Sequence, residues 1–403
     1  MKIALAVHAF DPQRDDASAW NAEFARRLAR LGHEVHVVSQ GFTKAGLALP
    51  IEAHAIGRVR SVIRRAAKAE AELRTLGADI VHDLGLTWYA DLFSSHAGSP
   101  LAMQASRVAA TGWLKRPVMR WRHRLLPSYR REAQLARRRL DNSGAEVVTW
   151  SEAAAADYQT FHGVGSDRCH VINKGVDIKR FAPHVRKLRR ETTRRKLGIN
   201  PTDLLLLFVG DDYARQGLHV TLQAVRRLVR MGKPIRLIVA GEDKAAGLDR
   251  QAARLGDQVV QFLGDVHDRL PYYAAADAFV LPARSEPSSQ SVLEAAACGL
   301  PCITTKATGA AELLSDGRDG FILDSGRSRL LADRVAELFD GQRLQKMGQA
   351  ARRTAMKYPF ERCVDRIVEV YDSILARREA DEPTVLTASH WRCDPAHAAR
   401  RAA

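Results

Sequence analysis

The chain has 403 residues and a formal net charge of +16. That length exceeds one ordinary hydrophobic core, so we expect two domains. The sequence lacks any run of about 18 apolar residues, which argues against a membrane-spanning helix. The apolar start, residues 1–8, favours a buried first strand over a signal peptide, and we expect a cytoplasmic protein. Cys298 and Cys302 lie close together without a second such pair, which favours small core residues over a zinc or disulfide site.

Short apolar runs alternate with helical stretches along the chain. Strands separated by helices of this length indicate βαβ units and parallel sheets. The cycle restarts after residue 184, so the sequence predicts an α/β protein with two doubly wound domains, residues 1–180 and 184–357. The expected strands are 2–10, 34–40, 78–85, 145–151 and 169–177 in the first domain, and 203–210, 234–241, 258–264, 277–282 and 301–305 in the second.

The domain boundary is expected in residues 177–198. This stretch has a proline, many charges and few strand formers, as is typical of a linker. One more amphipathic helix is predicted over residues 359–377. Residues 378–403 lack an apolar period, and we expect them to be disordered.

The net positive charge is concentrated in residues 107–139. This segment holds eleven Lys/Arg and one acid, Glu132, which gives +10. Trp113 and Trp121 lie among the arginines, a composition typical of an interfacial amphipathic helix. Such a patch attracts anionic lipid, phosphorylated glycans or other polyanions. A solvated helix with a core-facing stripe is the alternative, and both stay open. The residues expected at an acceptor or membrane surface are Arg116, Arg120, Arg124, Trp113 and Trp121.

Two glutamates, Glu286 and Glu294, stand eight positions apart in an otherwise uncharged run. Glu286 follows an expected parallel strand, and ligands bind at the carboxyl ends of such strands. Pro287 suits the first turn of the next helix, whose free N–H groups at residues 288–290 suit an anion or sugar hydroxyls. A carboxylate can accept from both hydroxyls of a vicinal diol. The pattern indicates a site for a sugar- and phosphate-bearing ligand; a surface glutamate and a capping glutamate are the alternative.

The stretch "ARSEPSSQSVLEAAACGLPCITT" resembles the E-x7-E signature of retaining glycosyltransferases with the GT-B architecture, of the family-4 type. Similar motifs continue in order along nearly the whole chain, among them "NKGVDIKRFAP", "FVGDDYARQGL" and "TGAAELLSDGRDGFIL". Within the family the chain is most similar to the lipopolysaccharide core glucosyltransferases. The resemblance implies two Rossmann-like domains facing across a cleft, with the C-terminal helix crossing back to the first domain.

The resemblance also implies residue roles. Glu294 should bind the ribose hydroxyls of the donor nucleotide, and Glu286 the donor sugar near its 3- and 4-hydroxyls. His96 matches the first-domain position that contacts the 6-hydroxyl side of that sugar. Asp83 and His82 are weaker candidates on the same face. The remaining donor-binding residues implied are Arg215, Ser288, Ser289, Gln290 and Val266.

Two departures from the family pattern concern charge near the donor phosphates. The family usually has an Arg…Lys-Gly pair, but here Asp211 and Gln216 take those positions, so Arg215 is the cation left to clamp the diphosphate. A Gly-Gly loop in the first domain is replaced by Asp15 and Asp16. Two acids there should repel a phosphate, so this loop is expected to meet acceptor hydroxyls or to lie out of the way.

The function that the resemblance implies is transfer of a hexose, glucose in the first instance, from UDP-glucose to a lipopolysaccharide core or related envelope glycan. The anomeric configuration would be retained, without a metal, a cofactor or an enzyme nucleophile, by a protein bound peripherally to the inner membrane. An exopolysaccharide or glycolipid mannosyltransferase using GDP-mannose is the alternative. A non-enzymatic polyanion-binding protein is a further one, although a nucleic-acid partner is not expected because aromatic stacking platforms and known motifs are lacking.

Overall fold

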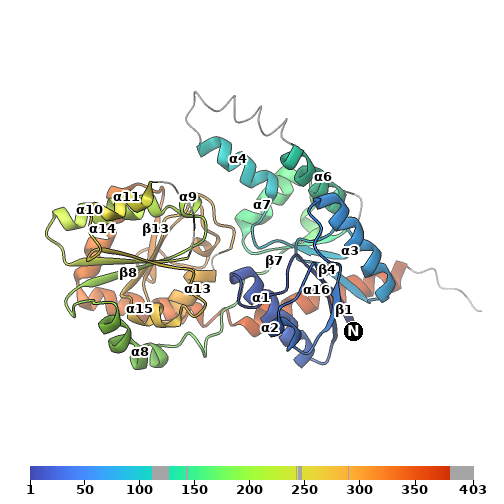
Figure 1. The fold of residues 1–403 in the computed structure, drawn as a ribbon, viewed down its shortest axis with the longest axis horizontal. Coiled ribbons are helices and arrows are strands. Elements are labelled where there is room, and N and C mark those ends of the chain that lie inside the picture. Colours follow the sequence, from blue (N-terminus) through green and yellow to red (C-terminus); the bar gives the residue numbers. More distant parts are fainter. Residues whose placement is uncertain (111–126, 142–143, 242, 244–246, 289, 382–403) are drawn as a thin grey trace, which may run out of the picture.

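The computed structural model describes residues 1–110, 127–141, 144–241, 243, 247–288 and 290–381. It has two α/β domains, each built on a parallel sheet (Figure 1). The first sheet has the order β3-β2-β1-β4-β5-β6-β7 and the second β10-β9-β8-β11-β12-β13. Both orders reverse beside the first strand of the domain, which is the topological switch point of a doubly wound fold. The predicted fold class is confirmed.

The strands are short and mostly apolar. In β8 all six residues are buried, as expected for a central parallel strand covered by helices on both faces. The bounds are β1 Lys2–Val7, β2 Glu34–Ser39, β3 Glu52–Ala55, β4 Ile80–Asp83, β5 Leu92–Ser94, β6 Glu146–Thr149, β7 Cys169–Val171, β8 Leu204–Val209, β9 Ile235–Ala240, β10 Val260–Gly264, β11 Ala278–Leu281, β12 Cys302–Thr305 and β13 Gly320–Leu323.

Helices cover both faces of each sheet. Those of the first domain are α1 Asp16–Arg30, α2 Lys44–Leu47, α3 Val62–Leu76, α4 Pro100–Ala110, α6 Pro127–Asp141 and α7 Glu152–His162. Those that follow are α8 Pro183–Lys196, α9 Tyr213–Gln216, α10 Leu218–Arg230, α11 Leu248–Ala253, α12 Leu270–Ala275, α13 Gln290–Ala297, α14 Ser328–Ala336, α15 Gly341–Ala355 and α16 Phe360–Asp381. Across all the residues that the structure describes, no helix combines the length and the apolar character needed to cross a bilayer.

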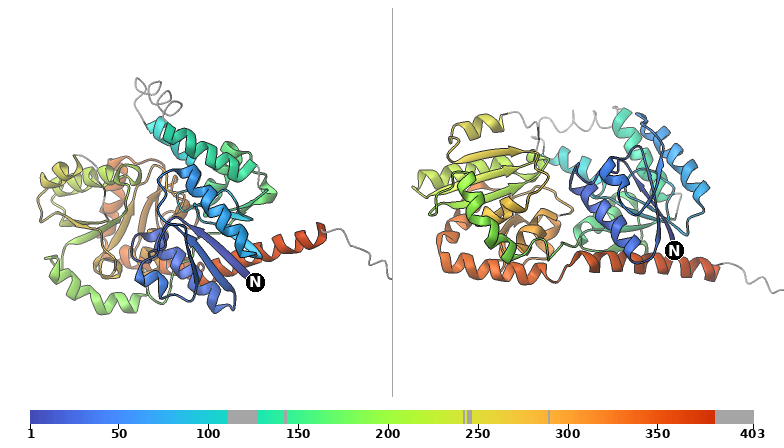
Figure 2. Two further views of the ribbon diagram at one scale, coloured as in Figure 1. Left: turned by 45° about the vertical axis from the view of Figure 1, so that its right-hand side comes forward. Right: turned by 60° about the horizontal axis from the view of Figure 1, so that its bottom comes forward.

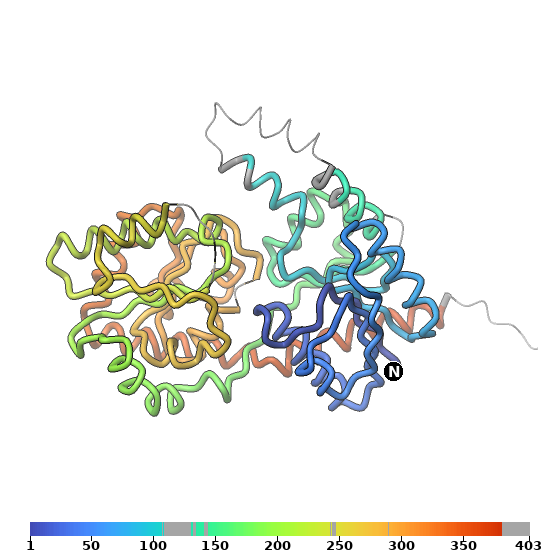
Figure 3. The backbone as a smooth tube through the Cα atoms, in the orientation of Figure 1, coloured from blue at the N-terminus to red at the C-terminus, as the bar shows by residue number. Residues whose placement is uncertain are grey.

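The last helix returns to the first domain. In the right-hand view of Figure 2, α15 lies under the second domain and α16 runs on beneath the first; Figure 3 shows the same C-terminal segment passing from one domain to the other. Val364, Ile367 and Tyr371 belong to the same buried cluster as Leu5 and Phe24. The predicted crossover is therefore present, and it fixes one domain to the other through apolar packing.

The stretch expected to be a linker, residues 177–198, is largely helical. Its residues 183–196 form α8, which packs against α12. Arg190 and Arg194 donate to Asp277 and to backbone carbonyls at the end of α12. Arg190 and Arg194, two of the charged residues that indicated a linker, are therefore bonded to the second domain.

The basic segment 107–139 is described only in part. Trp113, Trp121, Arg116, Arg120 and Arg124 lie outside the described residues, so their surface role stays a prediction. In α6, by contrast, Arg139 is buried and pairs with Asp83 at 2.8 Å. The expectation that the whole segment is a surface patch is wrong for this residue.

Candidate functional site

Glu286 lies in the loop after β11 and is 8% exposed. Its Oε2 accepts from Arg215 Nη1 at 2.8 Å and from Gln216 Nε2 at 2.9 Å. Its backbone pairs with the loop after β12, donating to the Ala307 carbonyl and accepting from the Gly309 N–H. Burial raises the pKa of Glu286, and the two donors oppose that rise. The carboxylate is therefore held in one place by groups of its own domain.

Gln216 occupies the position where the family usually has a lysine. Its Oε1 accepts from the backbone N–H groups of Asp211 and Asp212, while its amide nitrogen donates to Glu286. Arg215 donates from Nε to Asp212 at 3.1 Å and from Nη1 to Glu286. Its guanidinium thus lies between two carboxylates, which reduces the positive charge available to a diphosphate.

Glu294 projects from α13 into a cavity of about 270 Å³ between the domains. The negative charge of Asp16 approaches it from α1, and Arg269 offsets that charge in part. Burial, followed by the Asp16 charge, raises the pKa of Glu294 to about 7. The cavity is lined by Pro12, Asp16, Ala19, Trp20, Ala22, Glu23, Arg26, Asp177, Arg180, Phe181, Gln290, Glu294, Phe360 and Glu361.

The Asp15–Asp16 loop meets the second domain. Asp15 caps α1 by accepting from the Ser18 N–H at 2.7 Å. Asp16 forms an ion pair with Arg269 across the domain boundary. Nearby, His267 Nδ1 donates to the Gln13 carbonyl at 2.9 Å. The expectation that this loop could lie out of the way is wrong for Asp16, which helps to set the charge of the interdomain cavity.

His96 lies in the loop after β5. Its Nε2 is 2.8 Å from Asn21 Oδ1, which assigns the proton to Nε2 because an amide oxygen only accepts. The ring stacks on Trp150, and Nδ1 is buried without a partner in the described part of the chain. Burial holds the pKa of His96 well below its usual value. The imidazole is therefore neutral, and its Nδ1 is the atom that can accept a hydrogen bond from a sugar hydroxyl.

Three contacts bring the first domain against the Glu286 loop, two from the His96 loop and one from the start of α7. Ser288 Oγ donates to the His96 carbonyl at 3.2 Å, and Ser151 Oγ to the Pro287 carbonyl at 3.3 Å. Gly98 has a φ of 75°, and a Cβ there would lie 2.9 Å from Pro287. The structure thus brings the two residues with predicted catalytic roles to one boundary between the domains.

Lys174 is the residue at this boundary that we did not predict. It follows β7, is 5% exposed, and donates from Nζ to Ser288 Oγ at 3.2 Å. The ammonium also lies over the rings of Trp150 and Trp20, at 5.2 and 6.0 Å from their centroids. Its signal in the sequence is the lysine within the motif "NKGVDIKRFAP".

Comparison with known proteins decides the family. A model described as Glycosyltransferase Family 4 matches residues 18–180, and one described as Glycosyl transferases group 1 matches residues 189–354. The chain belongs to these glycosyltransferases. The two matches fall on the two sheets, one on each.

Among curated relatives, a D-inositol 3-phosphate glycosyltransferase of Corynebacterium urealyticum is 30% identical over 248 residues. The match covers 58% of each chain, so it spans less than two thirds of that relative. Among solved structures, WaaG, a glycosyltransferase involved in lipopolysaccharide biosynthesis, has a TM-score of 0.75 at 22% identity, covering 92% of this chain and 99% of that one. Anabaena HepE in complex with UDP-glucose has a TM-score of 0.70 at 19% identity, with 93% and 100% covered. These structural similarities establish the fold.

His82 and Asp83, the weaker site candidates of this glycosyltransferase, make structural contacts within the first domain and with α16. His82 lies 2.6 Å from Tyr371 Oη on α16 and 2.9 Å from Ser94 Oγ, and burial lowers its pKa to about 3. Asp83 accepts from three backbone N–H groups, at residues 85–87, and forms an ion pair with Arg139. Neither residue lines the interdomain cavity that Glu294 enters, so the structure does not place them with Glu294.

The remaining donor-binding candidates are placed as follows. Gln290 begins α13, lines the interdomain cavity and donates to the Gly175 carbonyl at 3.2 Å. Val266 is partly buried and packs against the core of the second domain. Ser289 lies outside the described residues. The donor roles of all three stay predictions.

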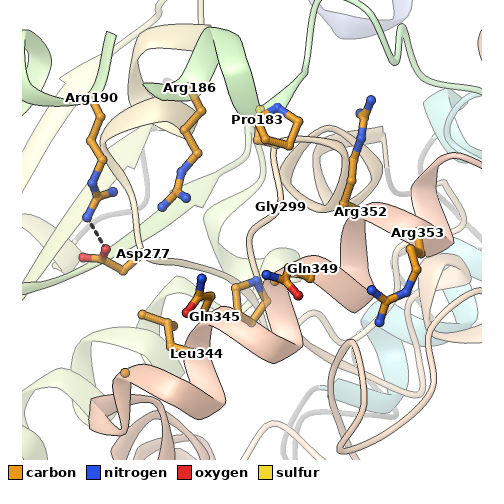
Figure 4. A pocket seen from close by; sticks show the side chains of 14 residues that line it. Pro183, Arg186, Arg190, Asp277, Gly299, Leu344, Gln345, Gln349, Arg352 and Arg353 are labelled. Atoms are coloured by element: carbon orange, nitrogen blue, oxygen red, sulfur yellow. Dashed lines mark hydrogen bonds and ion pairs between the residues drawn. The ribbon is translucent and has the colours of Figure 1, made fainter. Parts of the chain in front are cut away.

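A larger cavity, of about 550 Å³, lies on the second domain between α8, α13 and α15 (Figure 4). Its arginines serve the ends of helices: Arg190 donates to the Ala275 and Ala276 carbonyls, and Arg352 to the Ala297 carbonyl. Their charges are thus balanced by helix C-termini. We therefore take the smaller interdomain cavity, which Asp16 lines from the first domain and Glu294 from the second, as the site of this glycosyltransferase.

Proposed function

We propose that this glycosyltransferase transfers a hexose, glucose in the first instance, from UDP-glucose to a lipopolysaccharide core or related envelope glycan, with retention of configuration. One observation carries the proposal: the loops that hold Glu286 and His96 meet at the domain boundary, and Glu294 enters the interdomain cavity. Fixed acceptors on both sides of a boundary suit a ligand rich in hydroxyls. The similarity to WaaG and to HepE supports the choice of acceptor and donor.

In this proposal the bond between the sugar C1 and the donor phosphate oxygen breaks. The acceptor hydroxyl oxygen bonds to C1 on the same face, and its proton passes to the departing diphosphate. Glu286 and the free Nδ1 of His96 accept from sugar hydroxyls, and Glu294 accepts from the ribose. Cations and N–H groups oriented toward the diphosphate stabilise the leaving charge. We expect transfer without an added metal, and therefore unchanged rates in EDTA.

Two other substrate pairs are the alternatives. One is GDP-mannose with an exopolysaccharide or glycolipid acceptor, which the family resemblance implies. The curated relatives instead carry the name D-inositol 3-phosphate glycosyltransferase, which favours an inositol phosphate acceptor.

The test is a thermal-shift series with UDP-glucose, UDP-galactose, GDP-mannose and the free nucleotides, because a ligand bound to the native state raises its apparent stability. Stabilising donors are then incubated with deacylated lipopolysaccharide core or inositol 3-phosphate, and the anomeric configuration of the product is read by NMR. We expect UDP-glucose, the core acceptor and retention. Stabilisation by GDP-mannose alone would overturn the donor, and an inverted product the mechanism.

We also propose that residues 107–139 place the enzyme on an anionic membrane or a phosphorylated acceptor. Each basic residue near an anionic surface contributes about 1 kcal/mol, and salt screens this attraction. Changing Arg116, Arg120 and Arg124 together to Gln should weaken sedimentation with phosphatidylglycerol vesicles. The matched control changes three exposed arginines of α10 to Gln, namely Arg226, Arg227 and Arg230. Equal loss in both variants, or binding insensitive to salt, would contradict the role of the segment.

A further inference from the structure

Lys174 is a buried cation whose charge is poorly compensated. In the described residues, no carboxylate lies within ion-pair distance of its Nζ, and Ser288 Oγ is its one polar contact. Moving an ammonium out of water costs several kcal/mol after relaxation, whereas a cation–π contact returns about 2 kcal/mol. A lysine that is buried without an ion-pair partner indicates that an anionic ligand binds beside it.

In the described residues, the segment after β8 lacks a cation that is free of carboxylate partners. Gln216 stands where the family has a lysine, and its amide is committed to Glu286 and to the β8 loop. The guanidinium of Arg215 lies between Asp212 and Glu286. A nucleoside diphosphate brings at least two negative charges, which this arrangement leaves largely unbalanced.

We propose that Lys174 supplies the missing cation and binds the diphosphate of the nucleotide donor. Ser288 connects Lys174 to the expected phosphate site, because it belongs to the loop that leads into α13, where phosphate-binding N–H groups are expected. Ser288 accounts for one of the three donors of the ammonium. The positive charge has therefore moved from the loop after β8 to the segment after β7. This inference rests on the proposed nucleotide-sugar donor.

Lys174 should also limit donor binding at high pH. Burial lowers its pKa to about 8, against the attraction of nearby carboxylates. Below pH 8 the ammonium is charged and ready to bind. Above pH 8 the Lys174 amine must take up a proton when the ligand binds, so the affinity for the nucleotide donor should fall by up to about tenfold per pH unit. The titratable groups that face it are Asp16 from α1, His96 after β5, Glu286 after β11, Glu294 from α13 and Cys363 from α16.

The test is calorimetric titration of UDP and of uridine between pH 7 and 9.5, with wild type, Lys174→Met, Lys174→Arg and the control Lys179→Met. Lys179 is exposed in the same segment. We expect UDP to bind Lys174→Met about tenfold more weakly at pH 7 and to bind wild type more weakly above pH 8. In Lys174→Arg the loss of affinity above pH 8 should be absent, because guanidinium stays charged. Uridine, which lacks the diphosphate, should bind all four proteins equally.

Equal UDP affinity of wild type and Lys174→Met would overturn the proposal, as would an equal loss for uridine, which indicates a structural role. If Lys174→Met does not fold, the pH profiles of wild type and Lys174→Arg decide alone, and identical profiles refute the role. Binding of a GDP-sugar in place of UDP would correct the proposed donor and leave the Lys174 test intact with GDP. Wild type that binds neither nucleotide would refute both.

Discussion

Glu286 and Glu294 are close in sequence but lie in different environments. Glu286 is fixed by Arg215 and Gln216, both from the loop region after β8 of its own domain. Glu294 faces Asp16, which belongs to the other domain and pairs with Arg269. The first carboxylate is therefore set by one domain alone. The charge state of the second depends on how the two domains meet.

This difference separates their expected roles. A carboxylate with two fixed donors keeps its position before any ligand arrives, as binding in a transition state requires. A carboxylate with a pKa of about 7 changes its charge near neutral pH. Glu286 is suited to the reacting sugar, and Glu294 to a nucleotide contact that weakens when it is protonated.

The largest effect is expected for Glu286→Gln. The change keeps the shape but removes the charge that orients Arg215, so transfer should fall about 100-fold, or roughly 2.7 kcal/mol of transition-state stabilisation. Nucleotide affinity should change little. The measurement is kcat and KM with the accepted donor, with exposed Glu191→Gln as the control. Near-normal turnover in a folded Glu286→Gln protein would remove Glu286 from the site.

Glu294→Gln should weaken nucleotide binding and stabilise the fold. Losing a charge-assisted hydrogen bond to ribose costs about 1.5–3 kcal/mol, so the affinity for UDP and for uridine should fall at least about tenfold at pH 8. Because the folded pKa is raised from 4.5 to about 7, wild type loses stability as the pH rises between these values. The variant should thus have the higher Tm at pH 8 and the same Tm near pH 4. An unchanged Tm difference across this range would show that Glu294 is not ionised at a cost.

Much of the fold follows from local patterns in the sequence. Apolar runs at βαβ spacing predicted ten strands, including the fully buried β8. β3 and β13 were not among them; they are short, and β3 is mostly exposed. Residues 90–95, a strand-like run, contain the short β5. Residues 177–198 misled for a physical reason. Arginine on a helix indicates solvent until its partners are known, and here those partners, Asp277 and the carbonyls of α12, come about 80 residues later.

The site shows the same limit. Glu286 and Glu294 could be placed because loop, helix start and carboxylates lie within one short stretch. Lys174 could not, since its contacts with Trp20, Trp150 and Ser288 join three distant segments. Arg139 was assigned to a basic surface by composition alone, although its partner Asp83 lies on β4. Sequence predicts a residue's environment where the environment is local.

The smallest effect, and the sharpest test of the contrast, is expected for Asp16→Asn. The change removes the charge that raises the pKa of Glu294 and frees Arg269, so Glu294 should ionise at lower pH. It also removes the largest attraction on the Lys174 ammonium, whose pKa should fall too. Both limits of the UDP affinity profile should therefore move to lower pH, by up to about one unit, with only a few-fold change at the optimum.

Transfer by the sugar-binding Glu286 should be unaffected at saturating donor, because its partners belong to the other domain. The measurement is UDP affinity and kcat from pH 5.5 to 9.5, compared with Asp15→Asn, which alters a neighbouring carboxylate that caps α1 and pairs with Arg14. A profile that stays in place, or a kcat that falls with it, would mean that the two glutamates are not governed separately.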